Sequence, residues 1–156
     1  MRNIEELYEA STEDLPDLYC DMDQVLVDFL GGAEKVVGAP FAKSDNKTRW
    51  SKISGTKDFW ADLDWMPGAK KLYQRVAKYD TRILSAYSGK DSNSKSGKMK
   101  WLGKNTKVPR GRTHLVKRED KKAFAKTKDG KPNVLIDDYI KNLSLIHISE
   151  PTRLRR

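Results

Sequence analysis

The most informative stretch of the chain is LYCDMDQVLVDF, residues Leu18–Phe29. Its first three residues are mainly apolar and lead directly into Asp21, a pattern typical of a buried parallel strand. A second apolar run, NVLI at Asn133–Ile136, ends in the same way at Asp137 and Asp138. Because ligands bind outside the carboxyl ends of parallel strands, we expect these carboxylates to lie close together at one edge of a sheet.

Predicted helices and strands alternate along the chain between these two runs. Further strands are predicted at Thr81–Ala86 and Thr113–Val116. A helix interrupted at Gly31-Gly32 is predicted in Gln24–Val37, and short helices are predicted in Asp45–Trp65. A helix after Pro67-Gly68 is predicted to carry Leu72, Val76 and Tyr79 on one face. Two more helices are predicted, around Met99–Leu102 and at Lys121–Ala125. This alternation predicts an α/β fold, with a Rossmann-like parallel sheet.

Length and charge narrow the class of protein. The 156 residues allow one domain, and 31 Lys and Arg against 22 Asp and Glu give a net charge of +9. Cys20 is the only cysteine, which excludes an internal disulfide and a cysteine-built zinc site. Without an apolar run of about 20 residues or a secretory signal, a cytoplasmic protein with no membrane partner is expected. The positive charge is compatible with nucleic acid or phosphate-bearing substrates, and the oligomeric state stays open.

The motif residues resemble the haloacid dehalogenase superfamily, most closely its 5′(3′)-deoxyribonucleotidase branch of phage and bacterial type. LYCDMDQVLVDF is similar to the first motif of that family, and LIDD at Leu135–Asp138 is similar to the fourth. Ser85 in ILSAYS matches the hydroxyl residue of the second motif. Lys121 is assigned to the basic third motif, with Lys98 left as the alternative. FWADLDWMPGA at Phe59–Ala69 is similar to a stretch between the motifs.

The resemblance also implies domain boundaries. It implies a phosphatase domain at residues 1–142, with a small helical cap inserted at about residues 30–66. Residues Leu143–Arg156 begin LSLIHISEPTR, which resembles a translated sequencing adapter, so this tail is expected to be non-native. The domain is therefore expected to be truncated at its C-terminus.

The catalytic roles follow from the resemblance. Asp21 would be the nucleophile that forms an aspartyl-phosphate, and Asp23 the general acid and base. Ser85 and Lys121 would bind the phosphate oxygens.

The implied cofactor is Mg²⁺. Its ligands would be the Asp21 carboxylate, the main-chain carbonyl of Asp23, and Asp137 or Asp138, since Mg²⁺ prefers oxygen ligands.

The implied substrate is a nucleoside monophosphate, with a deoxyribonucleotide favoured. Phe29 and Trp60 stand at positions where the family has aromatic residues, and Phe29 would line the pocket for the base. Gln24 stands where this branch often has glycine, which leaves the nucleotide preference open. The lysine-rich stretch Lys90–Lys107 supports two alternatives: a polynucleotide-end phosphatase, or a catalytically inactive relative that binds nucleic acid.

Overall fold

The apolar runs of the sequence form a parallel sheet. The computed structural model describes residues 16–138. The strands in this range are β1 (Leu18–Cys20), β2 (Arg82–Ala86), β3 (Thr113–Val116) and β4 (Val134–Ile136). Their order is β3-β2-β1-β4, and every neighbouring pair is parallel. The predicted α/β class is confirmed, and the sheet is compatible with a Rossmann-like fold.

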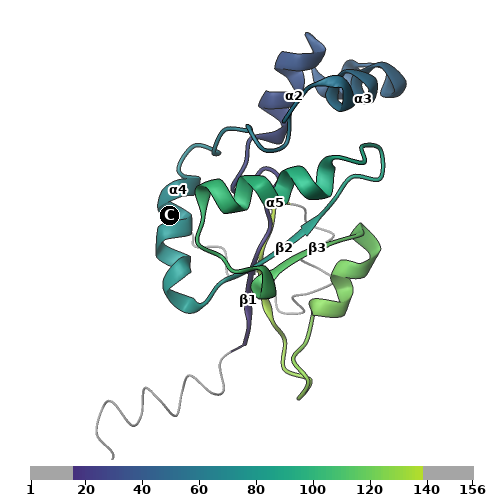
Figure 1. Ribbon diagram of the computed structural model, residues 1–156. Coiled ribbons are helices and arrows are strands. Elements are labelled where there is room, and N and C mark those ends of the chain that lie inside the picture. Colours follow the sequence, from purple (N-terminus) through teal and green to yellow (C-terminus); the bar gives the residue numbers. More distant parts are fainter. Residues whose placement is uncertain (1–15, 139–156) are drawn as a thin grey trace, which may run out of the picture.

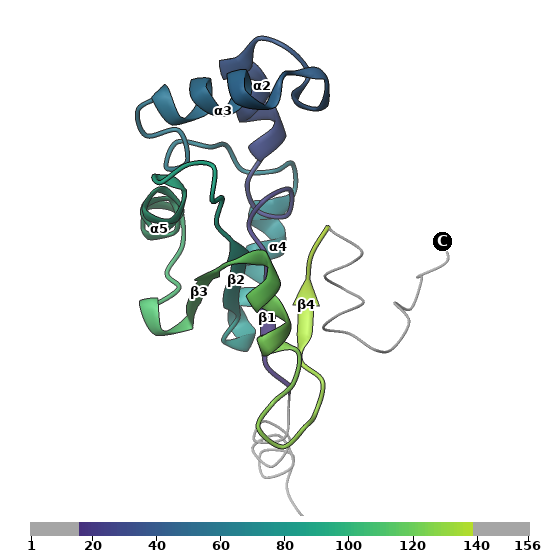
Figure 2. The ribbon, with the colours of Figure 1, turned by 90° about the vertical axis from the view of Figure 1, so that its right-hand side faces the viewer.

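The helices fall into two groups (Figures 1 and 2). Helices α2 (Phe29–Val37) and α3 (Asn46–Gly55) lie beyond one end of the sheet, while α4 (Ala69–Val76) and α5 (Ser94–Asn105) flank it. Short 3₁₀ helices complete the described chain: η1 (Phe41–Lys43), η2 (Ala77–Tyr79), η3 (Arg110–Arg112) and η4 (Arg118–Phe124). We call residues 29–65, which carry α2, η1 and α3, the helical insert. Its residues overlap the range of about 30–66 for which the resemblance implies a cap, and the assignment of a cap stays a prediction.

Side chains pack on both faces of the sheet because successive strand residues point in opposite directions. On one face, Cys20 and Ile83 pack with Trp101 of α5. On the other face, Tyr19, Leu84 and Leu135 form a cluster against which Phe124 of η4 packs. The insert has a separate cluster of buried residues: Ala33, Ile53, Phe59 and Trp60. The insert thus contains hydrophobic packing of its own.

The predicted interruption of α2 at Gly31-Gly32 is wrong, because the helix runs through both glycines. Asp28 caps the helix, and its side chain accepts a hydrogen bond from the Gly31 amide. A Cβ at Gly32 would lie 2.3 Å from a methyl carbon of Leu63. Glycine at this position therefore allows close packing rather than breaking the helix.

The predicted helix that places Leu72, Val76 and Tyr79 on one face does not extend to Tyr79. The α-helix ends at Val76, and Tyr79 follows in the 3₁₀ helix η2 with 66% of its surface exposed. Tyr73, within α4, packs against the core cluster that contains Cys20, Ile83 and Trp101.

Among the helices between residues 16 and 138, none combines the length and hydropathy of a membrane-spanning segment. The predicted adapter-derived tail, residues 143–156, lies outside the described residues.

Candidate active site

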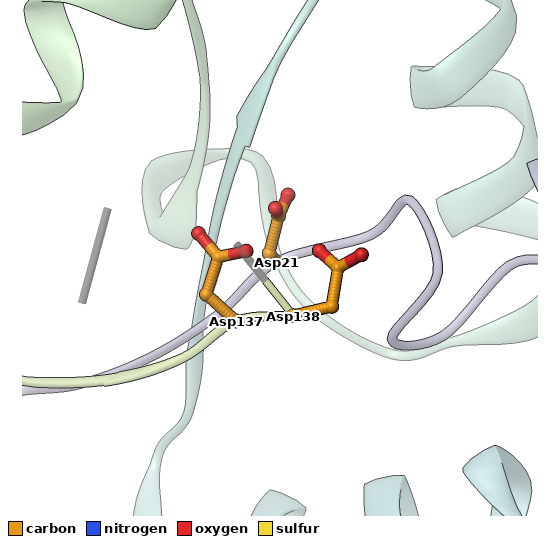
Figure 3. Close-up of side chains that lie close together, drawn as sticks. All are labelled: Asp21, Asp137 and Asp138. Carbon is orange, nitrogen blue, oxygen red and sulfur yellow. The ribbon is translucent and has the colours of Figure 1, made fainter. Parts of the chain in front are cut away.

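Three carboxylates meet where β1 and β4 end. The register pairs Cys20 with Ile136, and the amide of Asp21 donates to the carbonyl of Ile136 over 2.9 Å. Asp21 therefore lies beside Asp137 and Asp138, and one oxygen of each of the three carboxylates lies within 4.8 Å of the others. Figure 3 shows their carboxyl groups on the same side of the strand ends. The convergence expected from the sequence is present.

Burial and mutual repulsion disfavour the charged form of these carboxylates. Burial raises the pKa of Asp21 to about 6; the Lys121 ammonium opposes this rise, and the charges of Asp137 and Asp23 add to it. Burial also raises the pKa of Asp138, and a hydrogen bond with Asp137 raises it further. A bound cation would relieve this repulsion.

Lys121 supplies part of the missing positive charge. Its side chain is almost fully buried, and its ammonium lies 3.1 Å from Asp21 Oδ2 and 3.1 Å from Asp137 Oδ2. The sequence left the third-motif base open between Lys121 and Lys98. Of the two lysines, Lys121 contacts the predicted nucleophile, Asp21, and also Asp137 from the pair of aspartates after β4.

The three aspartates could hold a metal ion. All of the side-chain donors are carboxylate oxygens, the ligand type that hard divalent cations prefer. Burial and neighbouring carboxylates raise the pKa values of Asp21 and Asp138, and a bound cation would favour their charged forms. The residues therefore fit the divalent cation that the resemblance implies. The Asp23 side chain is outside this cluster, while the predicted role of its main-chain carbonyl stays a prediction.

A second buried lysine organises the remaining predicted residues. Lys98 of α5 donates to Asp23 Oδ2 over 2.7 Å, to Ser85 Oγ over 3.1 Å and to the carbonyl of Ala86 over 2.7 Å. The other oxygen of Asp23, Oδ1, is buried without a hydrogen-bond partner among the described residues. Lys98 therefore fixes one oxygen of the Asp23 carboxylate, while the other is buried without a hydrogen bond to residues 16–138.

Ser85 does not reach the open part of the site. It has no exposed surface, and the residues at this strand end that line the pocket are Ala86, Tyr87, Ser88 and Gly89. Its hydroxyl contacts Lys98. Direct phosphate binding by Ser85 stays a prediction, and positioning Lys98 is the role that its contacts support.

A pocket of about 440 Å³ lies between the carboxylates and the helical insert. Asp21, Asp23, Lys121 and Asp138 line one part of it. Aromatic side chains of the insert line another part: Phe29, Phe41, Trp50 and Trp60. The pocket thus combines a charged end with an aromatic end.

The predicted residues Phe29 and Trp60 are paired with each other at the aromatic end. Their rings stack with centroids 5.3 Å apart and planes 15° apart. A hydrogen bond holds the Trp60 ring in place, because its Nε1 donates to Asp91 Oδ2 over 2.7 Å. Phe41 and Trp50 were not predicted; the only signal for them was the density of aromatic residues in the insert.

Comparison with models of known protein families finds no match to this chain, and comparison with curated proteins finds no match either.

Proposed function

We propose that this chain is a Mg²⁺-dependent phosphomonoesterase of the haloacid dehalogenase type that hydrolyses nucleoside monophosphates, deoxyribonucleotides above all. The observation that carries the proposal is the contact set of Asp21. A buried carboxylate with a raised pKa lies between the Lys121 ammonium and two further carboxylates, and it lines a pocket. Such a constellation is typical of a catalytic group.

Asp21 is suited to act as the nucleophile. Its Oδ1 accepts a hydrogen bond of 2.7 Å from the Met22 amide, and its Oδ2 faces Lys121, so the carboxylate is held rigidly. In the first step an Asp21 oxygen bonds to phosphorus while the bond from phosphorus to the ester oxygen breaks. Mg²⁺ held by Asp21, Asp137 and Asp138 would supply positive charge that screens the carboxylate from the phosphate.

Asp23 is suited to move the protons. In the first step its protonated carboxyl donates to the departing ester oxygen, which leaves as the nucleoside hydroxyl. In the second step the Asp23 carboxylate takes a proton from water as that water attacks phosphorus, which releases inorganic phosphate and restores Asp21. The contact with Lys98 holds the carboxyl group in place through Oδ2.

The aromatic end of the pocket favours a nucleotide over a small phosphate ester. Flat rings bind nucleobases by stacking and by edge contacts. Phe29, Trp50 and Trp60 provide such rings in the same pocket as the carboxylates. Arg118 lines this pocket as well, and its positive charge suits a phosphate group.

Phosphate release from a substrate panel tests the proposal. The full 156-residue chain is incubated with 5′- and 3′-monophosphates of ribonucleosides and deoxyribonucleosides, and with 5′- and 3′-phosphorylated oligonucleotides, in Mg²⁺ or EDTA. We expect Mg²⁺-dependent release from mononucleotides and none from Asp21→Asn, which keeps the shape of the side chain. Release from oligonucleotide ends alone would favour the polynucleotide-end phosphatase. No release from any substrate would refute the enzymatic proposal.

A further inference from the structure

Gln24 has a backbone conformation that is unusual for its residue type. Its φ is +57°, in the left-handed region where a side chain crowds the backbone. Outside glycine, the other described residues with positive φ are Asp58 and Asp80, whose short polar side chains tolerate this region better. A strained residue persists where its surroundings hold it in place, so the contacts of Gln24 are informative.

The Gln24 side chain connects residues 21–24, which we call the catalytic loop, to the helical insert. Its Oε1 accepts a hydrogen bond of 2.9 Å from the amide of Leu30, in the first turn of α2. Its Nε2 lies 3.7 Å from the Met66 sulfur, a weak acceptor, where the chain returns from the insert. The residue before it is Asp23. Gln24 therefore touches both ends of the insert from a position beside the general acid.

The two ends of the insert are also paired through their main chains. The Asp28 amide donates to the Asp64 carbonyl over 2.9 Å, and the Met66 amide donates to the Leu26 carbonyl over 2.8 Å. The insert thus joins the sheet through two adjacent segments. The main-chain bonds fix these segments to each other, whereas the Gln24 side chain adds a contact from the catalytic loop to the helix itself.

The position of α2 matters for the pocket because its first residue is Phe29, which lines the aromatic end. Leu30, the residue that Gln24 holds, is the next in the chain. Gln24 also lines the pocket. A change in this contact would therefore move the Phe29 ring relative to Asp21 and Asp23 while leaving those carboxylates on their strand end.

We propose that Gln24 is a positioning residue that clamps the first turn of α2 to the catalytic loop and so sets the distance between the aromatic and charged ends of the pocket. The kinetic form of this inference rests on the proposed phosphomonoesterase function. It makes Gln24 a determinant of nucleotide binding that leaves phosphoryl transfer itself unaffected.

The kinetic test compares Gln24→Gly with the natural chain on two substrates. One is the nucleoside monophosphate hydrolysed fastest in the panel, and the other is glycerol 1-phosphate, which has no ring to contact Phe29. Glycine accepts the left-handed conformation and removes both side-chain contacts. We expect KM for the nucleotide to rise about tenfold, the size of one lost hydrogen bond, with kcat and the glycerol 1-phosphate constants unchanged. Equal losses on both substrates, or none on either, would overturn the proposal.

Asp28→Ala is the matched control. It also removes one side-chain hydrogen bond from the first turn of α2, namely the bond of 2.9 Å to the Gly31 amide, but Asp28 is not on the catalytic loop. A rise in nucleotide KM confined to Gln24→Gly supports the clamp. The same rise in both variants would assign the effect to helix capping in general and overturn the proposal.

Amide hydrogen exchange separates this inference from the proposed function. In Gln24→Gly the Leu30 amide should exchange faster, by about tenfold, while amides of β2 stay unchanged. Faster exchange at Leu30 in a chain that hydrolyses no substrate would refute the phosphomonoesterase and leave the clamp standing. Unchanged exchange at Leu30 would refute the clamp whatever the activity.

Discussion

Replacing Asp21 by asparagine should make the metal-free protein more stable at neutral pH. The substitution keeps the size and shape of the side chain, removes its charge and replaces one acceptor oxygen by an NH₂ group. Lys121, which lies 3.1 Å from Asp21 Oδ2, retains Asp137 at 3.1 Å and is not left without an anionic neighbour. The charged carboxylate is disfavoured by burial and by the other aspartates, so an uncharged amide avoids that cost.

The size of the effect follows from the pKa of Asp21. Its ordinary value is 3.8, and burial raises it to about 6 in the folded chain. The folded protein therefore holds this proton more tightly than the unfolded chain does. The resulting stabilisation is complete below pH 3.8 and is lost as the pH rises through about 6. At 1.36 kcal/mol per pH unit, the loss by pH 7.5 is about 3 kcal/mol.

Urea unfolding in EDTA at pH 4.5, 6 and 7.5 measures this difference. The free energy of unfolding of Asp21→Asn minus that of the natural chain should be about 1 kcal/mol at pH 4.5 and grow toward about 3 kcal/mol at pH 7.5. Taking the difference cancels the titration of groups that both chains share. A difference that is independent of pH, or an asparagine variant that is less stable at pH 7.5, would refute the reasoning. With Mg²⁺ at 100 times its dissociation constant the natural chain should gain about 2.7 kcal/mol, and the variant much less.

Three further predictions concern packing, pH and metal binding. Gly97→Ala should lower the free energy of unfolding by about 1–3 kcal/mol, because the new Cβ would lie 2.5 Å from the Cβ of Trp60. Gly103→Ala in the same helix should raise the free energy of unfolding by about 0.5–1 kcal/mol, because its Cβ meets no atom within 4 Å. Thermal melts check the pair, and equal midpoints would contradict the packing argument. Burial and the nearby Arg82 charge lower the pKa of His114. As the pH falls, the unfolded chain therefore binds a proton at this histidine before the folded chain does, and the free energy of unfolding should fall below pH 6.5. His114→Leu should weaken that fall between pH 7.5 and 5.5 in urea titrations, and identical slopes would count against it. Asp138→Asn should weaken Mg²⁺ binding at least about tenfold by titration calorimetry, while an exposed substitution such as Asp129→Asn leaves it unchanged; equal affinities would remove Asp138 from the metal site.

The sheet and the strand-end carboxylates were predictable because both depend on short-range patterns. Apolar runs that end at Asp21 and Asp137 carry the information for parallel strands with a polar edge. The continuous helix through Gly31 and Gly32 was not predictable, because its reason is the Leu63 side chain, which lies about thirty residues away.

The second lysine of the site was only partly predictable. Lys98 was named as an alternative to Lys121, but the sequence did not show that Lys98 contacts Asp23 while Lys121 contacts Asp21 and Asp137. That division depends on how α5 packs against the sheet, which brings Lys98 to Asp23 across 75 residues. The prediction of the aromatic end of the pocket was incomplete for the same reason, since Phe41 and Trp50 are brought to Phe29 only by the fold of the insert.

The two lysines and four aspartates of the strand ends have a consequence for how ligands bind together. Their formal charges leave an excess of two negative charges, which one divalent cation neutralises. Without the cation, a phosphate dianion that approaches the site is repelled by the net negative charge of these groups. With the cation bound, their net charge is zero and this repulsion is removed. Affinities of the two ligands are therefore linked, and each must raise the other by the same factor. Loss of phosphate as product would then weaken the binding of the cation as well.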